Sequence, residues 1–433
     1  MNKIILLVLF SLPVKIFSQD TLLTLQRTIK ISMENNFDIR ILNNLSKQAE
    51  NNNTAGNAGM LPSIDANLLY FHSSYSLEQK YATSPDVNTD ASVSKNMIAD
   101  IGAAWTIFDG TKMFSTRSRL SEQSALSQDQ LKIQIENSLV EVIESYYAIV
   151  RQQQLLKLVK EELLLTEERV NISERKMTNG SGSRLDWLQA KTENNRQRSA
   201  KLLIETESQS ERINLNKLLG RNIESAFSVE DTVIVTYNPS FEDLKRSVIT
   251  QNNFLNFYRR NKRIAELGLK ETKALRSPII KFNAHYIYSK NTNEAGYSLL
   301  NKSYGFNYGA TATIPLFHGS NISGQIKNSK LEFERADIFM ESVTAEVNAD
   351  LYKEWLMFKN NLELLQLEEQ NIIYAREVFS ISHERYRIGV SNSVEQYEAQ
   401  RTFEEATTRL IDARYNSKLS ETMLRKLNGE LVK

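Results

Sequence analysis

The side chains that most often carry bond chemistry are sparse in this sequence. The 433-residue chain has no cysteine, which excludes disulfides, thiol catalysis, iron–sulfur ligation and a lipid-modified N-terminal cysteine. Its histidines are too scattered to suggest a metal or catalytic cluster: His72, His285, His318 and His383. It also lacks a glycine-rich phosphate loop. The sequence therefore predicts no enzymatic activity, no cofactor and no metal site.

Acidic residues follow two turn-like segments, and these are the best candidates for a functional role. Asp186 comes after the segment 178–183, and Glu395 and Glu398 come after 387–392. Ser183 and Asn392 stand three residues before Asp186 and Glu395, which is the spacing of a helix capping box. Acids in a first helical turn are stabilising in any case. Capping alone could therefore explain Asp186 and Glu395, whereas Glu398 lies a turn further into the helix.

The elements that would position these acids are long helices. No glycine or proline occurs between Gly110 and Gly180, or between Gly324 and Gly389. Uninterrupted stretches rich in Leu, Glu, Gln, Lys and Arg predict helices over 111–177, 184–219, 320–386 and 393–428. The first of these would be on the order of 100 Å long, so we expect an elongated protein.

The chain also contains a tandem duplication. Phe108-Asp109-Gly110 matches Phe317-His318-Gly319 at a shift of 209, and Lys217-Leu218-Leu219-Gly220 matches Lys426-Leu427-Asn428-Gly429 at the same shift. Independent landmarks that agree on one offset indicate an internal repeat. We therefore expect a first repeat over 20–220 and an inter-repeat segment with a second repeat over 221–433.

A seven-residue period runs through the long helices. Ile135, Val142, Ile149 and Leu156 begin a ladder that continues to Met177. A sustained heptad predicts left-handed supercoiling against neighbouring helices. The positions three residues later are often Ser, Thr or Gln, so the pattern leaves two arrangements open, a two-stranded coiled coil and a broad wall of helices.

Between the helices the hydrophobic period changes to two. Apolar and polar residues alternate over about 63–75, 98–108, 279–290 and 303–316, and the second pair is rich in tyrosine and phenylalanine. These patterns predict four strands, with polar loops at Ser76 to Met97 and Asn291 to Ser303. The strands suit either a soluble sheet or a tilted membrane sheet. In a membrane four strands cannot close a barrel, so several copies of the chain would have to combine theirs.

The net charge of the chain and its N-terminal residues indicate its partners and its location. The 53 basic and 52 acidic residues balance, which gives no electrostatic case for nucleic acid. Lys3 followed by the apolar run from Ile4 to Leu12 predicts a secretory signal peptide over 1–19, cleaved after Ser18 or Gln19. No later run is long and apolar enough for a membrane helix, so we expect an exported protein whose membrane segments, if it has them, are strands.

In their order and spacing, several short motifs together resemble the TolC-like outer membrane efflux proteins. The motifs span nearly the whole chain after residue 20: Asn35-Asn36-Phe37, Leu61-Pro62-Ser63, Phe108-Asp109-Gly110, Tyr386-Arg387-Ile388-Gly389, Val394-Glu395 to Ala399-Gln400, and Leu427-Asn428-Gly429. The resemblance implies a mainly α protein with a small β part. It would be a homotrimer whose strands form one outer-membrane β-barrel, continued into the periplasm by an α-barrel of long helices.

The resemblance also implies where function lies. The turns containing Gly180 and Ser181, and Gly389 and Val390, would be the periplasmic ends where an adaptor docks. Asp186, Glu395 and Glu398 match acidic positions at a pore constriction, and Tyr386 matches a residue that holds it shut. Gly182 departs from the family pattern, and we expect it to make the first turn looser.

These implications predict a passive conduit, not an enzyme. Its partners would be a periplasmic adaptor, an inner-membrane pump and outer-membrane lipid, without nucleic acid, in either tripartite efflux or type I secretion. The alternative is a periplasmic coiled-coil scaffold or adaptor without a membrane barrel, since such a protein would also have long heptads and a signal peptide.

Overall fold

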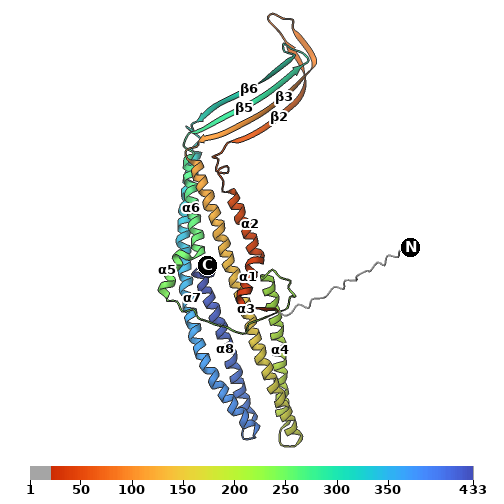
Figure 1. The fold of residues 1–433 in the computed structure, drawn as a ribbon, viewed down its shortest axis with the longest axis vertical. Coiled ribbons are helices and arrows are strands. Elements are labelled where there is room, and N and C mark those ends of the chain that lie inside the picture. The colour runs from red at the N-terminus through yellow and green to blue at the C-terminus, as the bar shows by residue number, and fades with distance from the viewer. Residues whose placement is uncertain (1–20, 433) are drawn as a thin grey trace, which may run out of the picture. The chain divides into compact units, whose positions relative to one another are not determined.

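The computed structural model describes residues 21–432, so the predicted signal peptide over 1–19 lies outside the described residues. The chain is mainly helical with a small β part, which confirms the predicted fold class (Figure 1). In chain order the elements are β1 (Thr21–Leu23), α1 (Leu25–Asn35), α2 (Phe37–Asn52), β2 (Ser63–Gln79), β3 (Val87–Phe108), α3 (Lys112–Thr178), α4 (Arg184–Leu218), β4 (Phe227–Val229), α5 (Phe241–Gln251), α6 (Asn253–Ala274), β5 (Ile279–Asn293), β6 (Leu300–Thr313), α7 (Asn321–Arg387) and α8 (Ser393–Leu427). Within residues 21–432, none of the helices has the length and apolar content to cross a membrane.

The long helices come in two matching pairs. Helices α3 and α7 are 67 residues each, and α4 and α8 are 35 residues each. Each end of α7 and α8 lies 209 positions after the corresponding end of α3 and α4, the same offset that relates the sequence motifs. Each repeat therefore contributes one hairpin of long helices.

The chain folds into two compact units, and each takes segments from both repeats. Within the described residues, the helical unit comprises 21–41, 132–252 and 347–432. The sheet unit comprises Leu42–Leu131 and Asn253–Glu346.

The sheet unit is built on four antiparallel strands in the order β2-β3-β5-β6 (Figure 1). The pairing of β3 with β5 joins the hairpin of the first repeat to that of the second, for example through Ile101 opposite Tyr286. Strands β2 and β6 are the edges of this sheet within the described residues.

The two faces of the sheet differ in chemistry, as alternation requires. One row across the sheet runs Ala66, Ile101, Tyr286 and Phe306, all apolar or aromatic. The next row runs Asp65, Gly102, His285 and Asn307 on the opposite face. On that polar face the Asp100 carboxylate lies 3.0 Å from His285 Nδ1, and it also accepts a hydrogen bond from Asn67.

The strands extend further than the sequence pattern predicted. The segment from Ser76 to Met97, expected to be a loop, continues β2 to Gln79 and begins β3 at Val87. Likewise β5 runs to Asn293 and β6 begins at Leu300. The loop prediction was wrong here because these residues are polar on both faces, yet their backbones still pair across the hairpins.

The core of the helical unit lies where the small β1-β4 sheet packs on α3 and α4. Val142 and Ile149 of the heptad ladder are fully buried there, beside Leu215, Leu219 and Phe227. The polar positions three residues after the ladder are buried as well: Ser138, Ser145, Gln152, Thr166 and Ser173. The second row of the heptad is therefore a buried polar seam.

Two of the family-like motifs have a structural role. The Asn36 side chain donates a hydrogen bond to the carbonyl oxygen of Leu218 at 3.0 Å, and Asn252 does the same to Leu427 at 2.9 Å. In this way the start of each repeat binds the carboxyl end of that repeat's last helix, satisfying carbonyls that have no partner within the helix.

Candidate functional site

Two helical turns in the helical unit share one backbone design. Gly180 and Gly389 have φ of 75° and 81°, a left-handed conformation that favours glycine. Their amides donate to the carbonyls of Met177 and Tyr386, both at 3.1 Å. The next amides, of Ser181 and Val390, donate to carbonyls five residues back. These hydrogen bonds end α3 and α7 and set the direction of the helix that follows.

Gly182 does not loosen the first turn, contrary to the expectation from sequence. A Cβ at this position would lie 2.7 Å from the Cβ of Lys176, so the backbone passes directly against α3. Gly182 is therefore a tight packing point, and the two turns have the same hydrogen bonds.

Asp186 and Glu395 both lie in the capped first turns of α4 and α8. The Ser183 hydroxyl accepts from the Asp186 amide at 3.0 Å and donates to the Asp186 carboxylate at 2.9 Å. The Asn392 side chain accepts from the Glu395 amide at 2.8 Å, and the Glu395 carboxylate lies 3.7 Å from Arg385. The predicted caps thus exist, and both carboxylates already have a neighbour.

Glu398 differs from the two capping acids. Its side chain is exposed on α8, and its carboxylate makes no hydrogen bond or ion pair with any residue from 21 to 432. Its carboxylate is therefore not held by a hydrogen bond or an ion pair, although its charge acts on Arg401 of the same helix.

Tyr386 links α7 to α3. Its ring is buried, with the Lys176 ammonium 4.8 Å from the ring centroid. Burial raises the pKa of Tyr386, while Arg169 and a hydrogen bond with Ser173 lower it. All three neighbours belong to α3, so Tyr386 fastens the end of one hairpin to the other.

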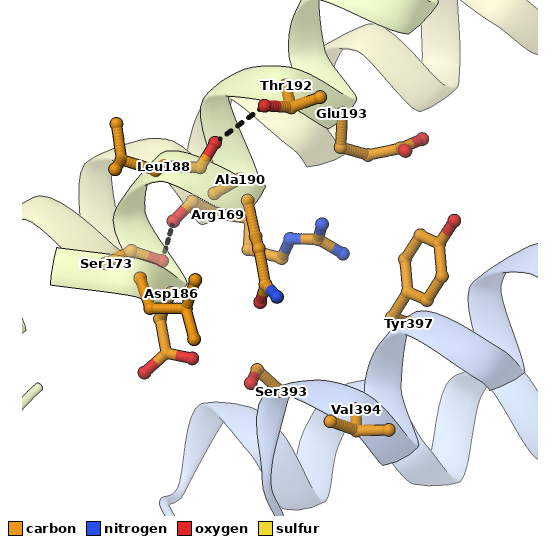
Figure 2. A pocket seen from close by; sticks show the side chains of 12 residues that line it. Arg169, Ser173, Asp186, Leu188, Ala190, Thr192, Glu193, Ser393, Val394 and Tyr397 are labelled. Carbon is orange, nitrogen blue, oxygen red and sulfur yellow. Dashed lines mark hydrogen bonds between the residues drawn. The ribbon is translucent and has the colours of Figure 1, made fainter. Parts of the chain in front are cut away.

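A cavity of about 520 Å³ lies between the start of α8 and the α3–α4 hairpin (Figure 2). Its walls include Arg169 and Ser173 from α3, Asp186 from α4, and Val394 and Tyr397 from α8. Glu395 and Glu398 are not among its lining residues. The structure thus brings Asp186 to a shared cavity but leaves the two glutamates outside it.

Deeper between α3, α4 and α8 lies a buried polar network that sequence reasoning missed. Glu162 is 2% exposed and accepts a hydrogen bond from Gln400. Burial, together with the neighbouring Glu404 carboxyl, raises the pKa of Glu162 to about 8. Glu404 in turn accepts from Gln197 at 2.7 Å and from Arg196 at 3.2 Å. No signal in the sequence indicated this network, because Glu162 lies outside both the heptad ladder and the polar row three residues after it.

Comparison with known proteins identifies the chain. The family described as "Outer membrane efflux protein" matches residues 28–221 and 263–430. This chain belongs to that family. An alignment of 301 residues with the outer membrane protein TolC of Vibrio cholerae serotype O1 covers 68% of each protein. The two sequences are 22% identical over this alignment.

Solved structures of similar fold span almost the whole of this outer membrane efflux protein. The outer membrane protein VceC of Vibrio cholerae aligns with a TM-score of 0.77 at 15% identity, covering 94% of this chain and 96% of VceC. The Campylobacter jejuni CmeC outer membrane channel aligns with a TM-score of 0.78 at 14% identity, covering 94% and 85%.

Family membership confirms three predictions. The chain is an outer membrane efflux channel, it functions in the outer membrane and periplasm, and its role is transport rather than catalysis. Members of this family are trimers that work with adaptors and inner-membrane pumps. The scaffold alternative is not favoured.

Proposed function

We propose that three copies of this efflux protein assemble into one passive conduit by combining their strands in a single β-barrel. The observation that carries this proposal is the exposed aromatic face of the sheet. Tyr304, Phe306 and Tyr308 of β6 are 70%, 76% and 80% exposed in the single chain. So large an exposed apolar surface needs a covering, which lipid would supply.

The edges of the sheet support the same proposal. Strands β2 and β6 each present one side without a partner strand in the described chain. In lipid such edges would leave backbone amides and carbonyls unsatisfied at several kcal/mol each. Pairing β2 of one copy with β6 of the next removes both edges, and twelve strands from three copies would close the ring.

We infer that the conduit opens at the helical turns. The hairpin tips at Gly180 and Ser181 and at Gly389 and Val390 are exposed and would be the docking points of a periplasmic adaptor, which joins the channel to an inner-membrane pump. Tyr386 would hold the tips closed through α3, and small shifts of α7 and α8 would release it. The pump supplies the energy, and the conduit itself performs no chemistry.

Asp186, Glu395 and Glu398 would form the constriction. Three copies of an inward carboxylate make a ring that attracts cations and repels anions. Glu398 carries most of this role in our proposal, because the other two carboxylates are engaged by Ser183 and Arg385.

Membrane fractionation with unheated gel electrophoresis tests the proposal. We expect the protein in the outer membrane, running as a detergent-resistant trimer that dissociates on heating, and forming pores in planar bilayers. A monomer in the soluble periplasmic fraction would contradict the conduit and restore the scaffold alternative.

A further inference from the structure

A buried cation faces the cavity between α8 and the α3–α4 hairpin. Arg169 is only 9% exposed, and its Nη1 is buried without a hydrogen-bond partner among residues 21–432. Leaving a buried charged donor unsatisfied costs several kcal/mol, so such a group normally meets an acceptor. The usual acceptor for a guanidinium is a carboxylate.

The acidic side chains that line the cavity do not form an ion pair with Arg169. The Asp186 carboxylate accepts from the Ser183 hydroxyl, and in Figure 2 it points away from the guanidinium. Glu193 is paired with Arg196. No ion pair joins Arg169 to a carboxylate within 4.0 Å in the part of the chain that the structure describes. What Arg169 does contact is the ring of Tyr397, whose centroid is 5.3 Å away.

The remaining walls combine apolar and polar side chains. Leu185 and Leu188 from α4 and Val394 from α8 line the cavity, together with Ala190 and the Tyr397 ring. Two of the polar side chains are satisfied locally, since Thr192 donates to the Leu188 carbonyl and Ser173 to the Arg169 carbonyl. The cavity therefore places a cation without an ion-pair partner beside exposed apolar side chains.

The size and position of the cavity narrow the ligand class. A volume of about 520 Å³ lies within the range of roughly 300–1,000 Å³ typical of small-molecule sites. The first turns of α4 and α8, both 35-residue helices, flank it. The positive ends of helix dipoles favour an anion at such a place.

We propose that this cavity binds an amphipathic organic carboxylate. The carboxylate pairs with the Arg169 guanidinium where it lines the cavity, and the apolar body lies against Leu185, Leu188 and Val394. Because the walls come from α3, α4 and α8, the ligand contacts both hairpins. The ligand favours the state in which the two hairpins are packed together. The size of this shift is set by how much more tightly the ligand binds the packed state than the separated one.

The test compares an acid with its neutral isostere on the purified full-length channel in lipid nanodiscs. Isothermal titration calorimetry would measure the binding of 2-naphthoate and 2-naphthamide. We expect the acid to bind at least about tenfold more tightly, the value of one charge-assisted hydrogen bond. Arg169→Gln should abolish the preference for the acid, whereas Arg175→Gln, at an exposed arginine on the same helix, should preserve it.

A second variant tests the site without touching the buried guanidinium. Leu185 is exposed at the cavity rim, so the Leu185→Glu variant should fold normally. It should weaken the binding of 2-naphthoate more than the binding of 2-naphthamide. Equal affinities of the wild type for the two probes, or equal losses in Arg169→Gln and Arg175→Gln, would overturn the proposal. In either case Arg169 would find its acceptor elsewhere, and the conduit function would be unaffected.

Discussion

Around the helical turns, single residues differ mainly in whether a neighbour already holds them. Ser183 holds the Asp186 carboxylate, Arg385 lies beside that of Glu395, and α3 surrounds the Tyr386 ring. Glu398 has none of these restraints. At the scale of the residue, in the proposed constriction, engaged side chains would fix the closed geometry, and Glu398 would act on the permeating solute.

Glu398→Ala should weaken the block of the pore by multivalent cations. Removing one carboxylate from each copy would abolish the ring, and we expect the half-blocking concentration to rise about fivefold or more, since even one carboxylate about 4 Å from a cationic charge contributes ~1 kcal/mol in water. Planar-bilayer conductance with increasing hexamminecobalt measures this. Glu242→Ala, at an exposed acid in the first turn of α5, is the control. Unchanged block in Glu398→Ala would remove Glu398 from the constriction.

Tyr386→Phe should make the closed tips less stable. The change removes the hydrogen bond with Ser173 but keeps the ring beside Lys176. One such bond contributes about 0.5–1.5 kcal/mol, so the opening equilibrium should shift by up to about tenfold. Single-channel recording would show longer open times. Tyr374→Phe, at an exposed tyrosine of α7, should leave them unaltered. If both variants behaved like the wild type, Tyr386 would have only a packing role.

At the scale of the element, the recurring sequence motifs lie at the ends of the helices. Gly220 and Gly429 follow α4 and α8 with φ of 60° and 66°, and each lies against the backbone that precedes Asn36 or Asn252. The repeated Asn-Asn-Phe and Leu-x-Gly motifs therefore meet in space. Their recurrence is therefore explained by this joint between elements.

Substituting alanine for two different glycines should have opposite effects on stability. Gly429→Ala should destabilise the fold by about 1–3 kcal/mol, because its φ is positive and a Cβ would collide with the Gln251 carbonyl. Gly268→Ala, within α6 where a Cβ meets nothing within 4 Å, should stabilise by about 0.5–1 kcal/mol. Thermal unfolding of the two purified variants would compare them. A stable Gly429→Ala protein would mean that this joint relaxes easily.

The buried network between α3, α4 and α8 should make stability depend on pH. The pKa of Glu162 rises from its usual value of 4.5 to about 8, so the folded chain keeps a proton that the unfolded chain has released. Stability should therefore fall as the pH increases from 4.5 to about 8, and level off above that. The slope is at most about 1.4 kcal/mol per pH unit for one proton.

Unfolding measurements across this pH range would test the assignment to Glu162. Glu162→Gln should flatten the profile, because the neutral amide has no proton to lose. Glu161→Gln, which changes the exposed neighbouring residue, should show the same dependence of stability on pH as the wild type. A Glu162→Gln profile that keeps the wild-type slope would place the titrating group elsewhere.

Elements could be predicted from sequence more readily than the contacts between them. The glycine-free stretches indicated the long helices, and alternating aromatics such as Tyr304 and Phe306 indicated the strands. Glu162 and Arg169 could not be singled out, because an acid or a base on a long polar helix has the same pattern whether it faces water or a neighbouring helix. Their burial depends on how α4 and α8 pack on α3, which no local periodicity specifies.

At the scale of the whole molecule, we propose that the chain needs other copies of itself and lipid to cover its sheet. The helical unit has its own core around Val142 and Ile149, but one face of the sheet unit is exposed and aromatic. The polar face, with Asp100 and His285 joined across strands, needs no such cover. In the proposed barrel, the aromatic face would meet lipid outside and the polar face would line a water-filled lumen.

Two adjacent residues of β6 allow this arrangement to be tested with the same substitution on each face. Phe306 lies on the aromatic face, opposite Tyr286, and Asn307 lies on the polar face, opposite His285. In a membrane strand, arginine on the lipid face costs about 2–4 kcal/mol at the bilayer midplane and less near its surfaces. Because a trimer repeats this cost in every copy, Phe306→Arg should sharply reduce the heat-sensitive trimer recovered from the outer membrane, whereas Asn307→Arg should assemble and change only ion selectivity. If Asn307→Arg abolished assembly and Phe306→Arg did not, the faces would be reversed and the aromatic residues would line the lumen. Equal assembly of both variants would mean that neither face of this strand meets lipid.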